Sequence, residues 1–323
     1  MNTAFAPVDG HQARTASPAA SPLPSAAHLP EPNTHFAPPW RWPPALRASL
    51  GLHTVAGAAA ALLPGTENWA LSAVLANHLG LTAAGLWPRS ALLGPNVKRL
   101  PEAAIARRQF ALTVDDGPDP VVTPVVLDLL DEAGVKATFF VIARRAVKHA
   151  ALLRETVRRG HDIQNHSHLH RHDFSLRGPK ALAREIGTAQ ERLADLTGQR
   201  PHCFRAPAGL RNPMLDPVLH RLGLHLVSWT RRGFDTQDPN PARVLNRLIG
   251  RNGQGLAAGD ILLLHDGNVR LTAQGRPVLL SVLAPLLAMA RAAGLEAATL
   301  REALPPRYSA TQSPGPALPP NPR

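Results

Sequence analysis

Cysteine and aromatic residues are scarce in this sequence. Its 323 residues include one cysteine, Cys203, so no intramolecular disulfide can form and no thiolate cluster can hold a structural zinc ion. Any metal must therefore be bound by histidine and carboxylate side chains. Aromatic residues make up 4% of the chain, and no basic run is interleaved with the stacking rings that single-strand binders use. We therefore expect no nucleic-acid partner.

Acidic residues are also in short supply. The chain has 35 Lys and Arg against 23 Asp and Glu, which gives a formal net charge of +12. A charge of this size attracts anionic surfaces such as phosphate-bearing lipids, although attraction alone does not define a binding site.

The two ends of the chain lack a sustained apolar period. Residues 1–44 and 304–323 are rich in Pro and Ala, and such segments cannot bury enough surface to offset the entropy of ordering. We expect a disordered leader and a disordered tail. The leader also argues against a cleaved signal peptide, because about 45 mostly polar residues precede the first apolar segment.

Two apolar segments follow the leader. Residues 46–63 and 69–87 are rich in Ala and Leu and are separated by the turn formers of residues 64–68. This pattern predicts a helical hairpin, which we assign to residues 45–88. The second segment has no formal charge and a Trp at each end, as expected of a membrane span with interfacial aromatic anchors. The first contains Arg47, so a soluble or amphipathic hairpin is the alternative.

From residue 109 onward, short β-rich runs alternate with helical patterns that end at glycines, which is typical of a parallel α/β sheet or barrel. The runs are 110–114, 137–142, 162–165, 202–205, 225–229, 261–264 and 297–300. About seven strand-helix units in residues 105–303 are too few for an eight-fold barrel. The predicted fold is therefore α/β, a distorted and incomplete (β/α) barrel. Its first helix is expected to be capped by Thr123 and to stop at Gly134.

Reactive side chains follow the predicted strands, where parallel α/β folds gather functional groups. They lie in residues 115–118, 166–170, 205–209 and 265–267, and at Asp235. Two histidines four apart can face one metal across a helical turn, and a carboxylate completes a His₂-carboxylate set with open positions for water. His166 with His170 has this spacing, and so has His168 with His172. A metal-free cluster of exposed histidines is the alternative.

Each of the other groups also has an ordinary structural explanation. Asp115 and Asp116 would repel each other without a nearby cation, but Asp-Gly-Pro is also a common turn sequence. Arg205 could form a surface ion pair, and His265 could end a strand with no further role. Trp229 fits the core better than a substrate platform. The residues alone leave these alternatives open.

Four ordered motifs resemble those of the polysaccharide deacetylase family, the NodB homology family of carbohydrate esterases. They are TVDDGP at 113–118, HSHLH at 166–170, RAPAG at 205–209 and LLH at 263–265. The resemblance covers about residues 109–300 and includes neither the leader nor the hairpin. It implies that Asp116, His166 and His170 bind one divalent metal ion, with zinc the expected ion. Asp115 would then be the catalytic base.

The same resemblance implies roles for four further residues. Arg205 matches the arginine that orients the base, and the backbone N–H of Ala208 matches the donor that stabilises the oxyanion. His265 resembles the general acid, and Asp235 resembles the aspartate that tunes this acid. The sequence departs from the family pattern at Val114, at Ala208, where an aromatic residue is usual, and around Asp235, where the Asp-Trp pair is absent.

These features predict a metal-dependent hydrolase of carbohydrate metabolism. It would remove N-acyl, usually N-acetyl, groups from amino sugars of a polysaccharide or a lipid-linked saccharide, and so act on carbon-nitrogen bonds other than peptide bonds. The alternative is a non-catalytic barrel at the membrane that binds glycans or lipid-linked sugars. A basic membrane-surface adaptor is a third hypothesis, which metal content would test.

Charge predicts the side of the membrane on which the barrel lies. Two spans return the chain to its starting side, so the leader and the barrel share a compartment. Arg41 and Arg47 precede the hairpin, five basic residues from Arg89 to Arg108 follow it, and its turn carries Glu67. By the positive-inside rule both flanks lie in the cytoplasm of a bacterial inner membrane, which favours a lipid-linked sugar as substrate. If the first segment does not insert, the barrel would face peptidoglycan or another envelope glycan.

Overall fold

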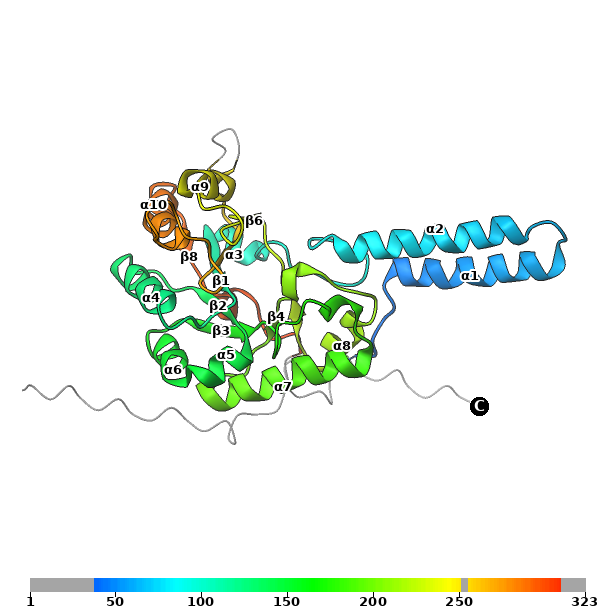
Figure 1. Ribbon diagram of the computed structural model, residues 1–323, viewed down its shortest axis with the longest axis horizontal. Coiled ribbons are helices and arrows are strands. Elements are labelled where there is room, and N and C mark those ends of the chain that lie inside the picture. Colours follow the sequence, from blue (N-terminus) through cyan, green and yellow to red (C-terminus); the bar gives the residue numbers. More distant parts are fainter. Residues whose placement is uncertain (1–37, 251–254, 309–323) are drawn as a thin grey trace, which may run out of the picture.

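The computed structural model describes residues 38–250 and 255–308 (Figure 1). Most of the predicted leader, residues 1–37, and of the predicted tail, residues 309–323, lies outside the described residues. The helices are α1 Pro44–Leu62, α2 Glu67–Leu86, α3 Glu102–Ala106, α4 Val122–Glu132, α5 Ala143–Lys148, α6 Ala150–Arg158, α7 Pro179–Thr197, α8 Leu215–Arg221, α9 Pro241–Ile249, α10 Val278–Ala292 and α11 Leu300–Ala303, with short 3₁₀ turns η3 Phe174–Leu176 and η4 Pro207–Gly209.

The strands form one curled parallel sheet. They are β1 Gln109–Asp115, β2 Thr138–Val141, β3 Asp162–Asn165, β4 Cys203–Phe204, β5 His225–Leu226, β6 Arg231–Arg232, β7 Ile261–His265 and β8 Glu296–Ala297. Their order is β5-β4-β3-β2-β1-β7-β6, and β8 pairs with β1 outside this path. Every strand pair is parallel. The predicted α/β class and incomplete barrel are therefore confirmed.

Alternation along β1 places the first catalytic candidate inside the barrel. Leu112 and Val114 point outward into the main core, where they pack with residues of α4 and α10, which cover this face of the sheet (Figure 1). Ala111 belongs to the inner cluster with Phe140 and Leu263. Because side chains alternate along a strand, Asp115 shares the inner face with Ala111.

The start of α4 differs from the prediction. Thr123 does not cap the helix, because α4 already begins at Val122. The Asp119 carboxylate instead accepts hydrogen bonds from the backbone N–H groups of Val121 and Val122, both at 2.9 Å. The Thr123 hydroxyl is buried and donates to Asp266. Gly134 follows the helix with φ +66°, as its predicted stop requires.

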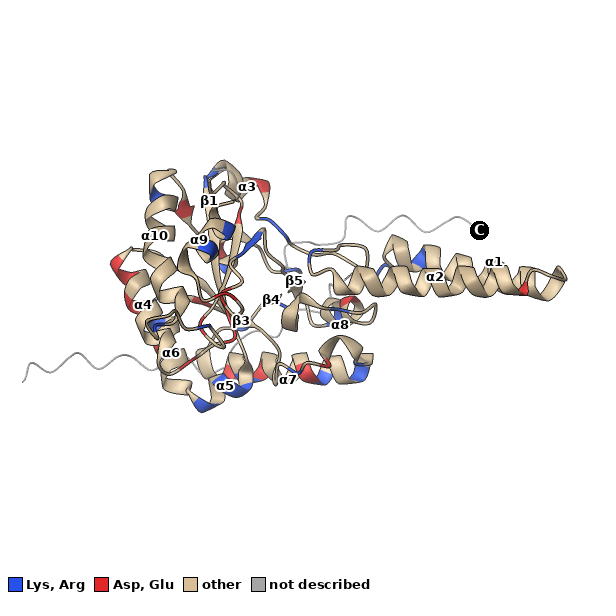
Figure 2. Ribbon diagram, turned by 45° about the horizontal axis from the view of Figure 1, so that its top comes forward, with Lys and Arg blue, Asp and Glu red and all other residues tan. Residues whose placement is uncertain are grey.

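The hairpin projects away from the barrel as two antiparallel helices, α1 and α2 (Figure 1). Both are long and apolar enough to cross a membrane, by length and composition. Charged residues gather on the barrel and are rare along the hairpin (Figure 2). Its base is fixed to the barrel, because Arg211 N–H donates to the Gly85 carbonyl at 3.1 Å and Trp40 Nε1 donates to Asp216 at 2.8 Å.

Candidate metal and catalytic site

Three predicted metal ligands meet at the carboxyl ends of β1 and β3. Ligand atoms of Asp116, His166 and His170 all lie within 4.8 Å of one another. Each histidine Nε2 lies 3.3 Å from Asp116 Oδ1. Two atoms that bind one zinc ion tetrahedrally at about 2.0–2.1 Å lie about 3.3 Å apart, so this spacing fits a metal site.

The ligand atoms have free lone pairs that can bind a cation. His166 Nδ1–H donates to the Arg205 carbonyl at 2.8 Å, which leaves the lone pair of Nε2 directed at Asp116. Asp116 Oδ1 is buried and has no hydrogen-bond partner among the described residues. Burial opposes ionisation of this carboxyl, but the neighbouring imidazoles of His166 and His170 hold its pKa well below the usual range. Burial, with the nearby His166, lowers the pKa of His170 to about 4, so its imidazole is neutral at pH 7.

The loop that carries the histidines is not the helical turn that the spacing suggested. Residues 166–170 lie outside any helix, and Ser167 and His170 have φ values of +68° and +52°. This backbone is unusual for residues with side chains. Within residues 38–250 and 255–308, the second candidate pair is not part of a three-ligand group. His172 instead lines the pocket, and His168 Nδ1 is buried nearby without a partner in the described chain.

Arg205 is a buried partner of Asp115 and not a surface arginine. Its side chain is 1% exposed, and Nη1 donates to Asp115 Oδ1 at 2.6 Å. Nη1 also donates to Thr113 Oγ1, and the other nitrogens donate to the carbonyls of Val227 and Ser228. Burial lowers the pKa of the guanidinium, and the charge of Asp115 opposes this effect. These contacts fix the orientation of the Asp115 carboxylate.

His265 and Asp235 form a second buried pair. His265 Nδ1 lies 2.8 Å from Asp235 Oδ1, and the backbone N–H of His265 donates to Asp235 Oδ2 at 2.7 Å. Burial alone would lower the pKa of His265, but the neighbouring carboxylates, Asp235 first and then Asp115 and Asp116, together raise it. Asp235 therefore lies against His265, although the Asp-Trp sequence is absent around it.

Ala208 lies at the mouth of the same pocket, in η4. Its φ of +54° is unusual for alanine. No carbonyl or side chain of the described residues accepts a hydrogen bond from its N–H group. This N–H is thus a free donor beside the cluster of Asp116, His166 and His170.

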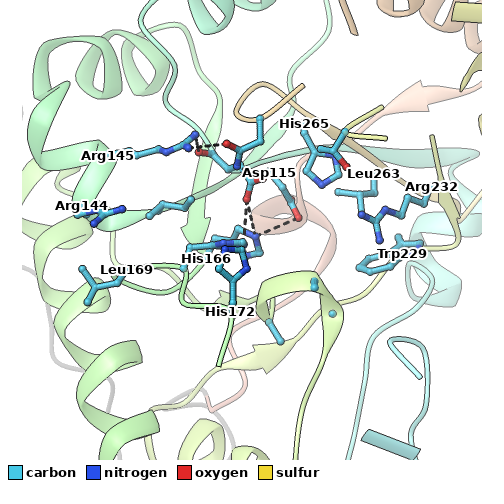
Figure 3. Close-up of a pocket in the computed structure, with 18 residues that line it drawn as sticks. Asp115, Arg144, Arg145, His166, Leu169, His172, Trp229, Arg232, Leu263 and His265 are labelled. Carbon is cyan, nitrogen blue, oxygen red and sulfur yellow. Dashed lines mark hydrogen bonds and ion pairs between the residues drawn. The ribbon is translucent and has the colours of Figure 1, made fainter. Parts of the chain in front are cut away.

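The three possible metal ligands line one cavity of about 470 Å³ together with Asp115, Ala208 and His265 (Figure 3). Arg205 and Asp235 lie behind it and hold Asp115 and His265. The sequence motifs did not point to several of its lining residues. Arg145 donates to the Asp116 carbonyl at 2.8 Å and to Asn268 at 3.0 Å, while Asn268 Nδ2 donates to Asp116 Oδ2 at 3.0 Å. Arg144 and Arg232 also line it. Arg145 lies in α5, outside the four sequence motifs, so no local signal could have placed it here.

Comparison with known proteins identifies similar sequences and structures. Residues 104–227 match the family model described as polysaccharide deacetylase. A chitooligosaccharide deacetylase of Azorhizobium caulinodans is 34% identical over 168 residues, which cover 51% of this chain and 78% of that one. A peptidoglycan-N-acetylglucosamine deacetylase of Bacillus cereus is 32% identical over 160 residues, 49% of this chain and 72% of that one.

Solved structures share the fold. A family 4 carbohydrate esterase from Streptomyces lividans, in complex with acetate, superposes with a TM-score of 0.52 at 27% identity and covers 58% of this chain and 91% of its own. A pseudoenzyme of carbohydrate esterase family 4 from Bacillus anthracis, at 19% identity and a TM-score of 0.56, covers 65% of this chain and 68% of its own and is alike in fold alone. On the sequence relatives, the family model and the fold, this chain belongs to the polysaccharide deacetylase family, and its named sequence relatives are deacetylases of chitooligosaccharides and of peptidoglycan N-acetylglucosamine.

Proposed function

We propose that this protein is a metal-dependent hydrolase that removes N-acyl, usually N-acetyl, groups from amino sugars. The observation that carries the proposal is the pairing of Arg205 with Asp115 beside the three possible ligands Asp116, His166 and His170. A base, its orienting cation and a metal site thus share one pocket. The proposed catalytic unit is residues 105–303, with a separate hairpin at residues 45–88, a leader at 1–44 and a tail at 304–323.

The donor set fits a divalent ion such as zinc, because two imidazole nitrogens and one carboxylate oxygen leave open positions for substrate and water. When bound, such an ion supplies Lewis acidity toward the acyl carbonyl and toward the attacking water.

Asp115 is the proposed base. Arg205 holds its Oδ1, which leaves Oδ2 to accept a proton, and Oδ2 lies 3.8 Å from His166 Nε2, on the side of the ligand cluster. A water between Asp115 and the acyl carbonyl would therefore lose its proton to Oδ2 as it attacks.

The remaining groups serve the oxyanion and the leaving amine. The Ala208 N–H can donate to the oxyanion, and one such donor is typically worth about 3 kcal/mol in the transition state. His265 Nδ1–H donates to Asp235, so Nε2 is the atom that gives a proton to the departing amine. The products are a free amino sugar and acetate or another short acid. Because each of these catalytic groups is present, a purely glycan-binding barrel is the weaker hypothesis.

The hairpin supports a place at the membrane. Two apolar helices and basic flanks fit an inner-membrane anchor with the barrel on the cytoplasmic side. Chitooligosaccharides and peptidoglycan appear in the names of relatives. On the cytoplasmic side, an N-acylated sugar on a lipid carrier would be the corresponding substrate.

Acetate release from a panel of N-acetylated polymers, oligosaccharides and lipid-linked sugars tests the proposal. Activity should disappear with a chelator and return with zinc. His166→Ala should lose the metal, whereas His168→Ala, outside the ligand group, should keep it. Turnover that survives complete metal removal would overturn the proposal.

A further inference from the structure

The two arginines of β6 have different surroundings. Arg231 pairs with the buried carboxylate of Asp260, Nε to Oδ2, at 3.0 Å. Arg232 is paired in register with Leu263 of β7, and it lines the catalytic cavity together with Leu263. Because successive side chains on a strand point to opposite faces, one arginine stabilises the barrel and the other faces the pocket.

Arg232 has no anionic partner. Within the described residues it makes no ion pair, and its Nε is buried without a hydrogen-bond acceptor. The guanidinium carbon lies 5.4 Å from the centre of the Trp229 ring and 4.8 Å from that of Phe234. These rings hold the group in place without satisfying its donors.

The surroundings of Arg232 add to its positive charge. Arg205 also lies over the Trp229 ring, at 5.9 Å, but its charge is paired with Asp115. Arg144 lines the cavity from the other side, and its side chain makes no hydrogen bond or ion pair with the described residues (Figure 3). The pocket therefore has unneutralised cations on two walls, and an oxygen anion with several acceptor atoms would satisfy the free donors of a guanidinium.

The segment around Ser228 and Trp229, next to Arg232, is in contact with the end of the helical hairpin. Ser228 Oγ donates to the Pro88 carbonyl at 2.6 Å, two residues after α2 ends. A Cβ added at Gly209 would lie 2.5 Å from Pro88 and 2.8 Å from Trp229, so these segments are closely packed. Trp87 is 68% exposed at the same place, as suits a residue at a lipid headgroup layer. A phosphoryl group that joins a sugar to a membrane lipid would lie at this level.

We infer that Arg232 is an anion-binding residue of the catalytic pocket that selects N-acylated sugars carrying a phosphoryl group. The inference rests on the proposed deacetylase function and names its substrate class. Arg232 binds the phosphoryl oxygens through its free guanidinium donors and takes no part in the chemical step. The neutral sugar polymers of the family would then be poorer substrates than a glycosyl phosphate.

The test compares two substrates that differ in one group, N-acetylglucosamine 1-phosphate and methyl N-acetylglucosaminide. Arg232→Gln should raise KM for the phosphorylated sugar about tenfold or more, with kcat little changed, because a charge-assisted hydrogen bond is lost. KM for the neutral sugar should stay within about twofold, and Arg232→Lys should restore part of the difference. Arg243→Gln, which removes one charge from an exposed arginine of α9 that is paired with Asp238, is the matched control.

Equal losses on both substrates would overturn the inference, since they would indicate a structural role for Arg232. A polyprenyl-phosphate-linked sugar in detergent identifies the source of the phosphoryl group. Faster turnover than with the soluble phosphate indicates a lipid carrier, and equal turnover indicates a soluble glycosyl phosphate.

Calorimetry with inorganic pyrophosphate separates this inference from the proposed function. If no N-acetylated substrate of the panel is hydrolysed, the proposed function fails, but pyrophosphate should still bind the full chain and bind Arg232→Gln about tenfold more weakly at the same metal content. Unchanged binding would overturn the assignment of Arg232.

Discussion

Two adjacent aspartates at the end of β1 have different surroundings. Asp115 is held by Arg205, whereas Asp116 lies against the histidines. Sequence motifs predicted both residues, but the burial of Arg205 could not be predicted, because most single arginines pair at the surface. The backbone at Asp116 has φ +74° and breaks the alternation of the strand, so both carboxylates face His166 Nε2, at 3.8 Å for Asp115 and 3.3 Å for Asp116.

This difference predicts separate effects of two substitutions. Asp115→Asn should keep the metal while turnover falls about a hundredfold or more, since a general base is lost without loss of a ligand. Asp116→Asn should lose both metal and activity. Elemental analysis and acetate release measured on the same samples would check this, and equal metal loss in the two variants would show that Asp115 is a ligand.

Asp235 should set the alkaline limit of activity. A general acid works in its protonated form, so the rate falls as pH rises through its pKa. The Asp235 carboxylate raises the pKa of His265 against the opposing effect of burial. Asp235→Asn should therefore move the alkaline limb of the kcat/KM profile to lower pH. A uniform loss at every pH, with the limb unmoved, would mean that Asp235 only positions the imidazole.

At the scale of elements, every strand except β6 could be predicted from the sequence. The seven predicted runs correspond to β1 to β5, β7 and β8, with shorter strands at β4 and β5 than predicted. β6 was missed because its two residues are arginines without an apolar pattern. β8 ends at Ala297, since Thr299 caps α11 and turns the chain into a helix. β6 and β8 form strands because they pair with β7 and β1, and this pairing cannot be read from such short segments.

The cap that Asp119 provides at the start of α4 should contribute measurably to stability. Asp119→Ala removes the acceptor for two backbone N–H groups of the first helical turn. We expect a loss of about 1 kcal/mol in the free energy of unfolding, the usual cost of a missing helix cap. Denaturant unfolding at neutral pH would measure it. Glu132→Ala is the control, because Glu132 lies at the other end of α4 and forms no ion pair with the described residues. It should cost less than half as much.

The hairpin and the barrel form one connected body at the scale of the whole molecule. Hydrogen bonds from Arg211 to Gly85 and from Ser228 to Pro88 tie the end of α2 to loops that flank the catalytic pocket. Within the hairpin, Asn77 donates to Ser49 at 2.8 Å and His53 Nε2 lies 3.2 Å from His78 Nε2. Polar contacts of this kind hold helices together in a membrane. The pocket therefore keeps a fixed position relative to whatever surface the hairpin enters.

If the hairpin inserts into a membrane as proposed, the direction of insertion decides which substrates can reach the pocket. Arg41 and Arg47 precede the helices and five basic residues from Arg89 to Arg108 follow them, whereas the turn carries Glu67. The positive-inside rule then predicts that both flanks stay in the cytoplasm.

Reporter fusions after residue 308 test this topology. A green fluorescent protein fusion should fluoresce and an alkaline phosphatase fusion should be inactive, because the first matures in the cytoplasm and the second only outside it. Replacing Thr66 and Glu67 by lysine should weaken the orientation, since it adds positive charge to the turn, whereas replacing them by serine should not. Alkaline phosphatase activity in the unchanged chain would mean that one helix alone spans the membrane. The pocket would then face the envelope, and an external glycan would replace the lipid-linked sugar as substrate while the hydrolytic site stays the same.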